Sequence, residues 1–193
     1  MEESTEDDPQ QSVAQRLART GFKAMPARDL CGFMGIIEGR MSLKKGLLAM
    51  RVHLYLVNEE DETQFHQVYM VRKADPRQPI NKPSKTEEPL SIQTVDRRTM
   101  LLCSDLIESE DPYMEVLDAR TSVDYSMDEV VISWPEARHM LALPIMTWPE
   151  RKRMGALCIF GKEPETTSVR ELDFKFLRSM AAQLYVCEPR RWL

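Results

Sequence analysis

Two apolar runs, MLALPIM at 140–146 and MGALCIF at 154–160, precede a helical pattern at 168–184 and decide the fold class of this chain. Each run is short, apolar and bounded by turn residues, which is typical of a buried strand. Parallel neighbours need a crossover of a dozen or more residues, so the short connection at 147–153 predicts an antiparallel pair. The pattern therefore predicts two paired strands followed by a closing helix.

The closing helix is predicted from its start signal and its apolar period. Ser168 and Glu171 have the spacing of a capping box. Apolar residues then recur at three- and four-residue steps, which is the pattern of a helix with one buried face. These residues are Val169, Leu172, Phe176, Leu177, Met180, Ala181 and Leu184. We expect the helix to end near Cys187 and to share one core with the two strands.

Composition is ordinary for a globular protein of 193 residues, with 42% apolar and 30% charged residues. No run approaches the roughly 18 apolar residues that span a bilayer, and the acidic start is unlike a signal peptide, so we expect a cytoplasmic location. Residues 1–12 carry five acids and no base, which leaves 26 acids against 26 bases in the rest. Without a net field, the chain is expected to have neither a nucleic-acid nor a membrane partner.

The chain divides into an acidic tail at 1–11 that we expect to be disordered, a short helix and linker at 12–25, one domain at 26–188 and a tail at 189–193. Within the domain, a second helix is predicted at 27–40 because Leu30, Phe33, Met34, Ile37 and Met41 recur at helical steps. Ser12 and Gln15 form a capping box for the first helix.

Three glycines, Gly32, Gly35 and Gly39, lie inside the second predicted helix. Each costs about 1 kcal/mol of helix propensity relative to alanine. Their spacing places them near one side of the helix, which allows another element to approach closely. Two interpretations are open: packing inside the monomer, or a helix–helix seam between two copies of the chain.

A hairpin is predicted from alternating strands at 49–57 and 65–71, joined by a turn-rich segment. With a four-residue turn, His53 stands opposite His66 on one face. Two imidazoles so placed could hold a metal or form a polar surface pair, but no third ligand is evident. The four cysteines are far apart in sequence, and we expect reduced, buried thiols and no metal.

Between the hairpin and the apolar runs the pattern is weaker. Residues 73–89 hold four prolines and are predicted to form a long loop. Short strands are expected at 90–95 and 99–103, with Asp105 capping the segment that follows and a helical turn at 113–117. No catalytic motif is present, so we do not expect an enzyme.

In this order the elements resemble a GAF domain, over roughly residues 28–186. Thr99–Asp105 with Asp111-Pro112 is similar to that family's strand and acidic step, and Leu143-Pro-Ile145 with Gly155-Ala-Leu157 to its paired strands. The closing-helix match consists of Glu163-Pro164, Ser168, Glu171-Leu172, Leu177 and Ala181-Ala-Gln183. The cyclic-nucleotide signature of some relatives is absent, and so is the Cys-His pair of the bilin-bearing ones.

The resemblance implies an α+β fold with a central antiparallel sheet of about five or six strands. The N- and C-terminal helices would pack on one face, often forming a dimer, and loops and short helices would cover a ligand pocket on the other. Relatives bind cyclic nucleotides, tetrapyrroles, haem, small metabolites or nothing, so the cofactor stays unknown.

The function expected from this fold is a regulatory module that binds a small molecule or a partner protein and signals through its terminal helices. Five residues are candidates for lining the pocket: Leu101, Cys103, Trp134, His139 and Leu143. One alternative is a ligandless dimerisation or interaction scaffold, whose pocket is filled by its own side chains. Another is a thiol-based reductase of the free methionine sulfoxide reductase type, which needs two cysteines within disulfide reach.

Overall fold

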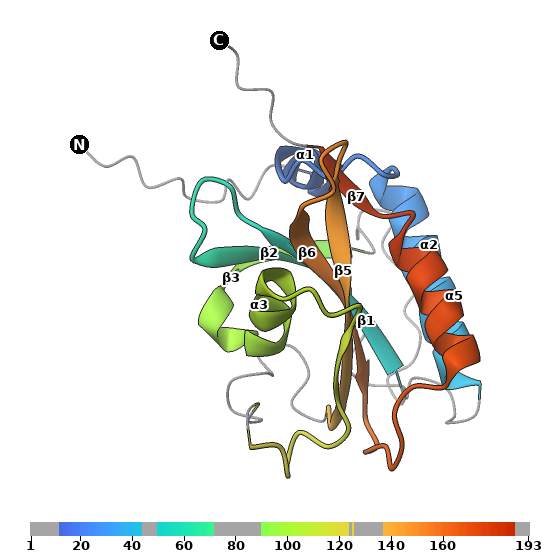
Figure 1. Ribbon diagram of the computed structural model, residues 1–193. Helices are drawn as coiled ribbons and strands as arrows, with labels where there is room; N and C mark the ends of the chain where they lie inside the picture. The colour runs from blue at the N-terminus through green and yellow to red at the C-terminus, as the bar shows by residue number, and fades with distance from the viewer. Residues whose placement is uncertain (1–11, 44–49, 72–89, 124, 126–136, 188–193) are drawn as a thin grey trace, which may run out of the picture.

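The computed structural model describes residues 12–43, 50–71, 90–123, 125 and 137–187. These residues form one mixed sheet with helices on both faces (Figure 1). The expected segments at 1–11, 73–89 and 189–193, and Trp134, lie outside the described residues. None of the described helices has the length and apolar character needed to cross a membrane.

In chain order the elements are α1 Val13–Arg19, α2 Ala27–Ser42, β1 Met50–Val57, β2 Gln64–Met70, β3 Leu90–Asp96, η1 Arg97–Thr99, α3 Leu101–Glu108, β4 Met114–Val116, β5 His139–Trp148, β6 Arg153–Gly161, α5 Glu171–Ala181 and β7 Tyr185–Cys187.

The sheet has seven strands in the order β3-β2-β1-β6-β5-β4, and β7 also pairs with β5. All pairs on the main path are antiparallel, and only β7 runs parallel to its neighbour. On the edge of β5 that faces away from β6, β4 pairs with Met140–Ala142 and β7 with Met146–Trp148. The predicted α+β fold and the antiparallel pairing of the two apolar runs are confirmed.

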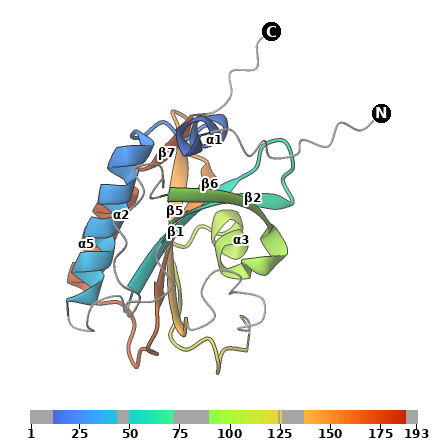
Figure 2. The same ribbon diagram turned by 180° about the vertical axis from the view of Figure 1, so that it is seen from behind.

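Helices α2 and α5 lie side by side along one face of the sheet, and α3 lies on the other (Figures 1 and 2). α2 packs on β1, α5 on β5, and α3 on β5 and β6. Arg40 near the end of α2 lies 3.9 Å from the carboxylate of Asp173 and 5.6 Å above the Phe176 ring in α5. The predicted packing of the N- and C-terminal helices on one face is therefore confirmed.

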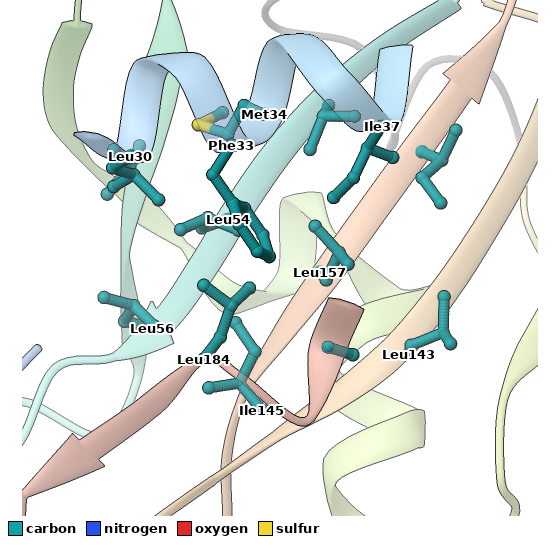
Figure 3. Packing of buried hydrophobic residues seen from close by; sticks show 14 of the residues in the cluster. Leu30, Phe33, Met34, Ile37, Leu54, Leu56, Leu143, Ile145, Leu157 and Leu184 are labelled. Carbon is teal, nitrogen blue, oxygen red and sulfur yellow. The ribbon is translucent and has the colours of Figure 1, made fainter. Parts of the chain in front are cut away.

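The core under α2 and α5 is aliphatic and tightly closed (Figure 3). Alternation in β1 turns Val52, Leu54 and Leu56 toward the helices, and all three are fully buried. The α2 face predicted from helical spacing supplies Leu30, Phe33, Met34 and Ile37, as expected. Burial of each such side chain contributes about 1.5–3 kcal/mol, so this core is the main source of stability.

The glycines of α2 point away from that core. A Cβ atom added at Gly32, Gly35 or Gly39 would meet nothing within 4 Å. The interpretation that these glycines pack inside the monomer is wrong, because the apolar stripe of α2 already fills the space toward the sheet. Beside them, Ile36 is 60% exposed.

The closing helix differs from its prediction at both ends. α5 begins at Glu171 without a side-chain cap, so Ser168 does not cap it. Instead the Val169 amide donates to the Glu115 carboxylate at 3.0 Å. The helix ends at Ala181, not near Cys187, because the free edge of β5 takes up the following residues as β7.

Most of the predicted apolar stripe of α5 is confirmed, with one exception. Phe176 and Met180 pack against the core cluster, and Leu177 is fully buried. Leu172, in the first turn of the helix, is 67% exposed and does not face the sheet.

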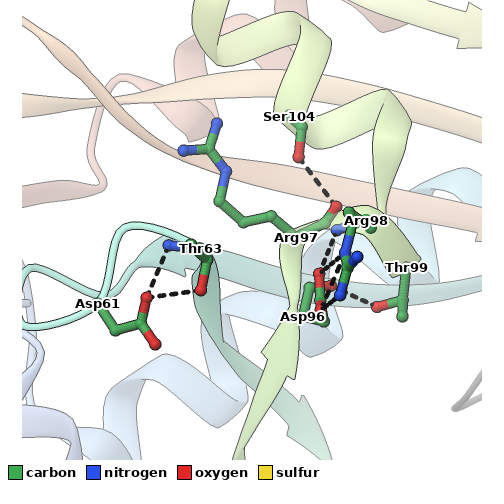
Figure 4. Close-up of polar contacts among 7 residues, drawn as sticks. All are labelled: Asp61, Thr63, Asp96, Arg97, Arg98, Thr99 and Ser104. Atoms are coloured by element: carbon green, nitrogen blue, oxygen red, sulfur yellow. Dashed lines mark hydrogen bonds and ion pairs between the residues drawn. The ribbon is translucent and has the colours of Figure 1, made fainter.

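The segment predicted as a strand at 99–103 is helical. Residues 97–99 form η1 and Leu101 starts α3, whose buried residues Leu102, Cys103 and Leu106 have helical spacing. Asp96 caps η1, since its carboxylate accepts from the Arg98 amide at 2.8 Å, and Ser104 in α3 donates to a carbonyl of η1 (Figure 4). An apolar run of three residues fits either period, which explains the error.

Two predictions for the neighbouring residues are also wrong. Asp105 lies inside α3 instead of capping a segment, and its carboxylate accepts a hydrogen bond from the Tyr125 hydroxyl at 2.8 Å. The helical turn expected at 113–117 is the short strand β4, which pairs with the edge of β5.

Candidate functional site

The face of the sheet under α3 holds a buried polar cluster, which we define as His53, Tyr55, Gln67 and Gln93. These side chains come from three adjacent strands, β1, β2 and β3. Tyr55, Gln67 and Gln93 form one row across the sheet, because the register pairs Tyr55 with Gln67 and Gln67 with Gln93. His53 is two residues from Tyr55 and so points to the same side. Three strands thus place four polar groups at one spot.

Gln67 joins the members of this cluster. Its Nε2 donates to the Tyr55 hydroxyl at 2.9 Å and lies 3.1 Å from Nδ1 of His53. Its Oε1 accepts from Nε2 of Gln93. Gln67 is 2% exposed. Its side-chain amide therefore supplies the hydrogen bonds that Tyr55 and Gln93 would otherwise make with water.

His53 is held in its neutral form. Burial lowers its pKa from 6.5 to about 3, and the nearby positive charge of Arg51 adds to the effect. Aromatic rings surround it, with the Phe160 ring edge-on at 5.0 Å and the Tyr69 ring at 5.6 Å. A neutral imidazole in this setting takes part as a hydrogen-bonding group and not as a charge.

Next to the cluster lie the thiols of Cys103, from α3, and Cys158, from β6. Both residues are fully buried and belong to the same core cluster. Burial raises the pKa of the Cys103 thiol, and the neighbouring Cys158 thiol raises it further. Burial also raises the pKa of Tyr55, and the nearby thiols of Cys158 and Cys103 add to that shift. The Cys103 thiol and the Tyr55 hydroxyl are therefore protonated at neutral pH.

The expected opposition of His53 and His66 is wrong. The register pairs His53 with Tyr69 and Leu56 with His66. Val57 pairs with Phe65, so seven residues, 58–64, connect the paired positions instead of four, and the Asn58 amide donates to the Gln64 carbonyl across the turn at 3.0 Å. The longer turn shifts the register by an odd number of residues, so the two imidazoles face opposite sides of the sheet. Among the described residues, no group of three or more histidine, cysteine or acidic side chains could hold a metal ion.

The sequence-predicted pocket residues are divided between the two faces. Leu101 and Cys103 lie in α3, half-buried and fully buried. Leu143 belongs to the core under α2 and α5. His139 alternates with Leu141 and Leu143 on β5 and so lies on their side of the sheet. Leu101 and Cys103 therefore share α3, on the opposite face of the sheet from His139 and Leu143.

His139 takes part in a buried pair that links three elements. Its Nε2 lies 2.8 Å from a carboxylate oxygen of Glu115 in β4, and the other oxygen accepts from the Val169 amide just before α5. Both side chains are more than nine-tenths buried, and Nδ1 of His139 has no hydrogen-bond partner. This pair ties the end of β5 to the start of α5, so its position is structural.

Sequence reasoning missed Gln67 and Gln93. The available signal was the alternation in the hairpin, which places Phe65 and Gln67 on one side of β2. Whether that side of β2 lies on the same face of the sheet as His53 and Tyr55 depends on the register, which the turn length sets. Since the predicted turn was too short, the residues appeared on the wrong face.

Comparison of folds places these features in a known architecture. The chain is similar to the GAF domain of an Acinetobacter phosphoenolpyruvate-protein phosphotransferase, with a TM-score of 0.52, 16% identity, and coverage of 90% of this chain and 91% of that one. A methyl-accepting chemotaxis protein, residues 122 to 287, gives a TM-score of 0.50 at 13% identity, covering 89% and 92%. The fold is that of a GAF domain.

A third GAF-fold match is an enzyme. The free methionine-R-sulfoxide reductase from Neisseria meningitidis, in complex with its substrate, gives a TM-score of 0.45 at 13% identity, covering 83% of this chain and 86% of that one. No family model matches the sequence, and no curated protein gives a significant match. At these identities the comparisons show the fold alone.

Proposed function

We propose that this GAF-fold chain is a regulatory module that acts by pairing with a second copy of itself through the outer face of α2. We define this face as Gly32, Gly35, Ile36, Gly39 and Leu43. The single observation that carries the proposal is that a Cβ atom added at any of the three glycines would meet nothing within 4 Å, while Ile36 and Leu43 are 60% and 76% exposed.

The monomer gives no reason for this composition. Three glycines inside one helix cost about 3 kcal/mol relative to alanine, and no contact in the described residues compensates for them. Small residues let two helices approach closely, and exposed apolar side chains beside them gain from being covered. A two-fold axis through this face would bring the same residues together from both copies.

The position of α2 suits a regulatory role. α2 packs on β1, the strand that carries His53 and Tyr55, and its end is joined to α5 through Arg40. A change in the packing around β1 therefore has a direct mechanical connection to the outer face of α2. In this way the terminal helices would carry the signal, as the resemblance to GAF domains implies.

The oligomeric state tests this proposal. Sedimentation velocity on the full chain over a range of concentrations is expected to give a dimer, and Ile36→Glu is expected to give a monomer because a buried charge would be placed at the seam. Leu172→Glu, at an equally exposed apolar position on α5, is the matched control and should leave the dimer intact. A monomeric parent protein, or equal loss with both variants, would contradict the proposal.

A second candidate function is binding of a small molecule on the face under α3. The observation that favours it is the buried polar cluster, because polar side chains in an otherwise apolar layer are typical of small-molecule sites. Leu101 and Cys103 would line this site. Trp134, His139 and Leu143 were also proposed for the pocket, but His139 and Leu143 lie on the other side of the sheet.

Native mass spectrometry after mild purification tests the second candidate. A retained molecule should appear as a mass above that of the chain, and Gln67→Leu should remove it while leaving the chain folded by circular dichroism. A parent protein whose native mass equals that of the chain alone, both as purified and after incubation with cell extract, would count against ligand binding.

A further inference from the structure

The hydrogen bonds of the buried polar cluster determine which nitrogen of His53 carries the proton. Burial lowers the pKa of His53 to about 3, so the ring is neutral and only one of its nitrogens bears a hydrogen. Nδ1 lies 3.1 Å from Nε2 of Gln67, and an amide nitrogen donates hydrogen bonds but accepts none. The Gln67 amide is held in this orientation because its oxygen accepts from Gln93. Nδ1 is therefore the acceptor, and the proton of the ring lies on Nε2.

The Nε2–H group of His53 has no hydrogen-bond partner within the part of the chain that the structure describes. The residue is only 3% exposed, and buried donors in proteins are nearly always paired. Nε2 is not wholly enclosed, because the fully enclosed polar atoms that lack a partner do not include it. A nearly buried donor that is still reachable and unpaired is suited to meet an acceptor on a bound molecule.

Aromatic side chains surround this imidazole. The Phe160 ring meets it edge-on with the ring centroids 5.0 Å apart, and the rings of Tyr69 and Tyr55 are tilted against it at 5.6 and 6.3 Å. The strand register continues from His53 through Tyr69 to Ser91. Tyr69 and Ser91 are half-buried, whereas Phe160 is 2% exposed, so the row reaches the surface at β2 and β3. Aromatic walls of this kind favour a flat ring.

The charge near His53 determines which acceptor is favoured. Arg51 lies two residues before His53 on β1 and so points to the same side of the sheet. Its positive charge acts on the imidazole, since it contributes to the lowered pKa of His53. An N–H donor next to a guanidinium repels a cation and attracts an oxygen with partial or full negative charge.

We propose that His53 is the recognition group of a ligand site under α3, where its Nε2–H donates to a carbonyl or carboxylate oxygen on a small molecule with a flat ring. The ring of this molecule lies against Tyr69, and its oxygen satisfies the donor that the chain leaves unpaired. This inference rests on the second candidate function, ligand binding under α3, and is independent of the contact through α2 on the opposite face.

NMR on the full chain with ¹⁵N-labelled histidine tests the proposal, because the chain has only three histidines, His53, His66 and His139. In the ligand-free parent the proton of His53 is expected on Nε2. Benzamide and benzoate present a carbonyl and a carboxylate on the same flat ring. A saturable shift of the His53 Nε2 resonance with either probe supports the proposal, and the tighter probe identifies the acceptor. Benzylammonium, with a cation on that ring, should cause no shift.

Two variants separate recognition from a structural role. His53→Phe keeps an aromatic ring but removes the N–H group, and it should bind the same probe about tenfold more weakly, which is the loss expected from one hydrogen bond. His66→Phe, the same change on the opposite face, is the matched control and should bind the probe as the parent does. Titration calorimetry measures both affinities. If His53→Phe does not fold, the NMR measurement on the parent decides the result.

Several outcomes would overturn the proposal. These are a proton on Nδ1 of His53, no saturable shift with benzamide or benzoate, equal binding of benzylammonium, and an unchanged affinity in a folded His53→Phe protein. In native mass spectrometry, a molecule retained equally by the parent and by His53→Phe would overturn this inference but leave ligand binding under α3 in place. A parent that retains no molecule and binds neither probe would overturn both.

Discussion

The two faces of the sheet are built from the same strands but by different chemistry. On β1, the residues that face α2 and α5 are aliphatic, while His53 and Tyr55 alternate with them and face α3. Among the described residues, the face under α2 and α5 holds the His139–Glu115 pair at the start of β5 and the Glu38 carboxylate bonded to the Val52 amide, whereas the α3 face holds hydrogen-bonded side chains from three strands and two thiols. The comparison shows that stability and specific chemistry are divided between the faces.

The largest expected effect is loss of an aliphatic side chain on the helix-covered face. Leu54→Ala should lower the free energy of unfolding by about 2–5 kcal/mol, because Leu54 is fully buried between β1 and α2 and the cavity cannot collapse. Urea denaturation followed by circular dichroism measures the change. Leu172→Ala, at an exposed position on α5, should change it by less than about 0.5 kcal/mol. Equal losses would show that Leu54 is not part of a tightly packed core.

On the α3 face the expected loss is smaller and arises from hydrogen bonds. Gln67→Leu should cost about 1–3 kcal/mol, because it leaves Tyr55 and Gln93 buried without the partner they now share. The same urea measurement applies. Gln93→Leu is the milder control, since Gln93 is half-buried and water can replace its partner. If Gln67→Leu instead had a higher free energy of unfolding than the parent, the polar cluster would lower the stability of the fold, and its role would lie elsewhere.

The pH dependence of stability should separate the faces further. Because the pKa of His53 falls from 6.5 to about 3 on folding, only the unfolded chain binds its proton between these values. Stability from this residue is complete above pH 6.5 and is lost as pH falls toward 3, by up to about 1.4 kcal/mol per pH unit.

Urea midpoints at pH 7 and pH 5 measure this effect. In His53→Leu the urea midpoint should change less between pH 7 and pH 5 than it does in the parent protein. In His66→Gln, on the other face, the change in midpoint between the two pH values should be the same as in the parent. A change in midpoint as large in His53→Leu as in the parent would contradict the buried neutral imidazole.

The smallest expected effect is a gain. Gly35→Ala should raise the free energy of unfolding of the monomer by about 0.5–1 kcal/mol, since the new methyl group meets nothing within 4 Å. Gly155→Ala is the contrasting change, because its Cβ would lie 2.7 Å from the Tyr55 carbonyl oxygen between two strands. Thermal unfolding at a concentration where the chain is monomeric compares them. A loss of stability at Gly35 would mean that the outer face of α2 is covered within the monomer.

Patterns that repeat over many residues were enough to predict most of the fold. The paired strands at 140–146 and 154–160 and the buried face of α2 were confirmed, because each is a long apolar pattern with a short or well-marked connection. Short segments were not predictable in this way. The residues at 99–103 fit a strand or a helix equally, and only their packing against β5 and β6 makes them helical.

The candidate site was predicted less well than the fold. Cys103 was expected to be a buried thiol on a strand and is buried in α3, but Gln67 and Gln93 were missed and His53 was given the wrong partner. Each of these errors depends on strand register, because seven residues instead of four between the paired positions shift the register by three and turn each side chain to the other face.

The sequence by itself determined the two apolar strands and the buried face of α2, since alternation in strands and the helical period gather apolar side chains on one face before any long-range contact forms. Only the tertiary structure decided which buried residues meet. The contact of His139 with Glu115, the row from Tyr55 to Gln93 and the return of β7 to the edge of β5 join segments distant in sequence. Such contacts depend on register and on the approach of whole layers, and no local pattern contains that information.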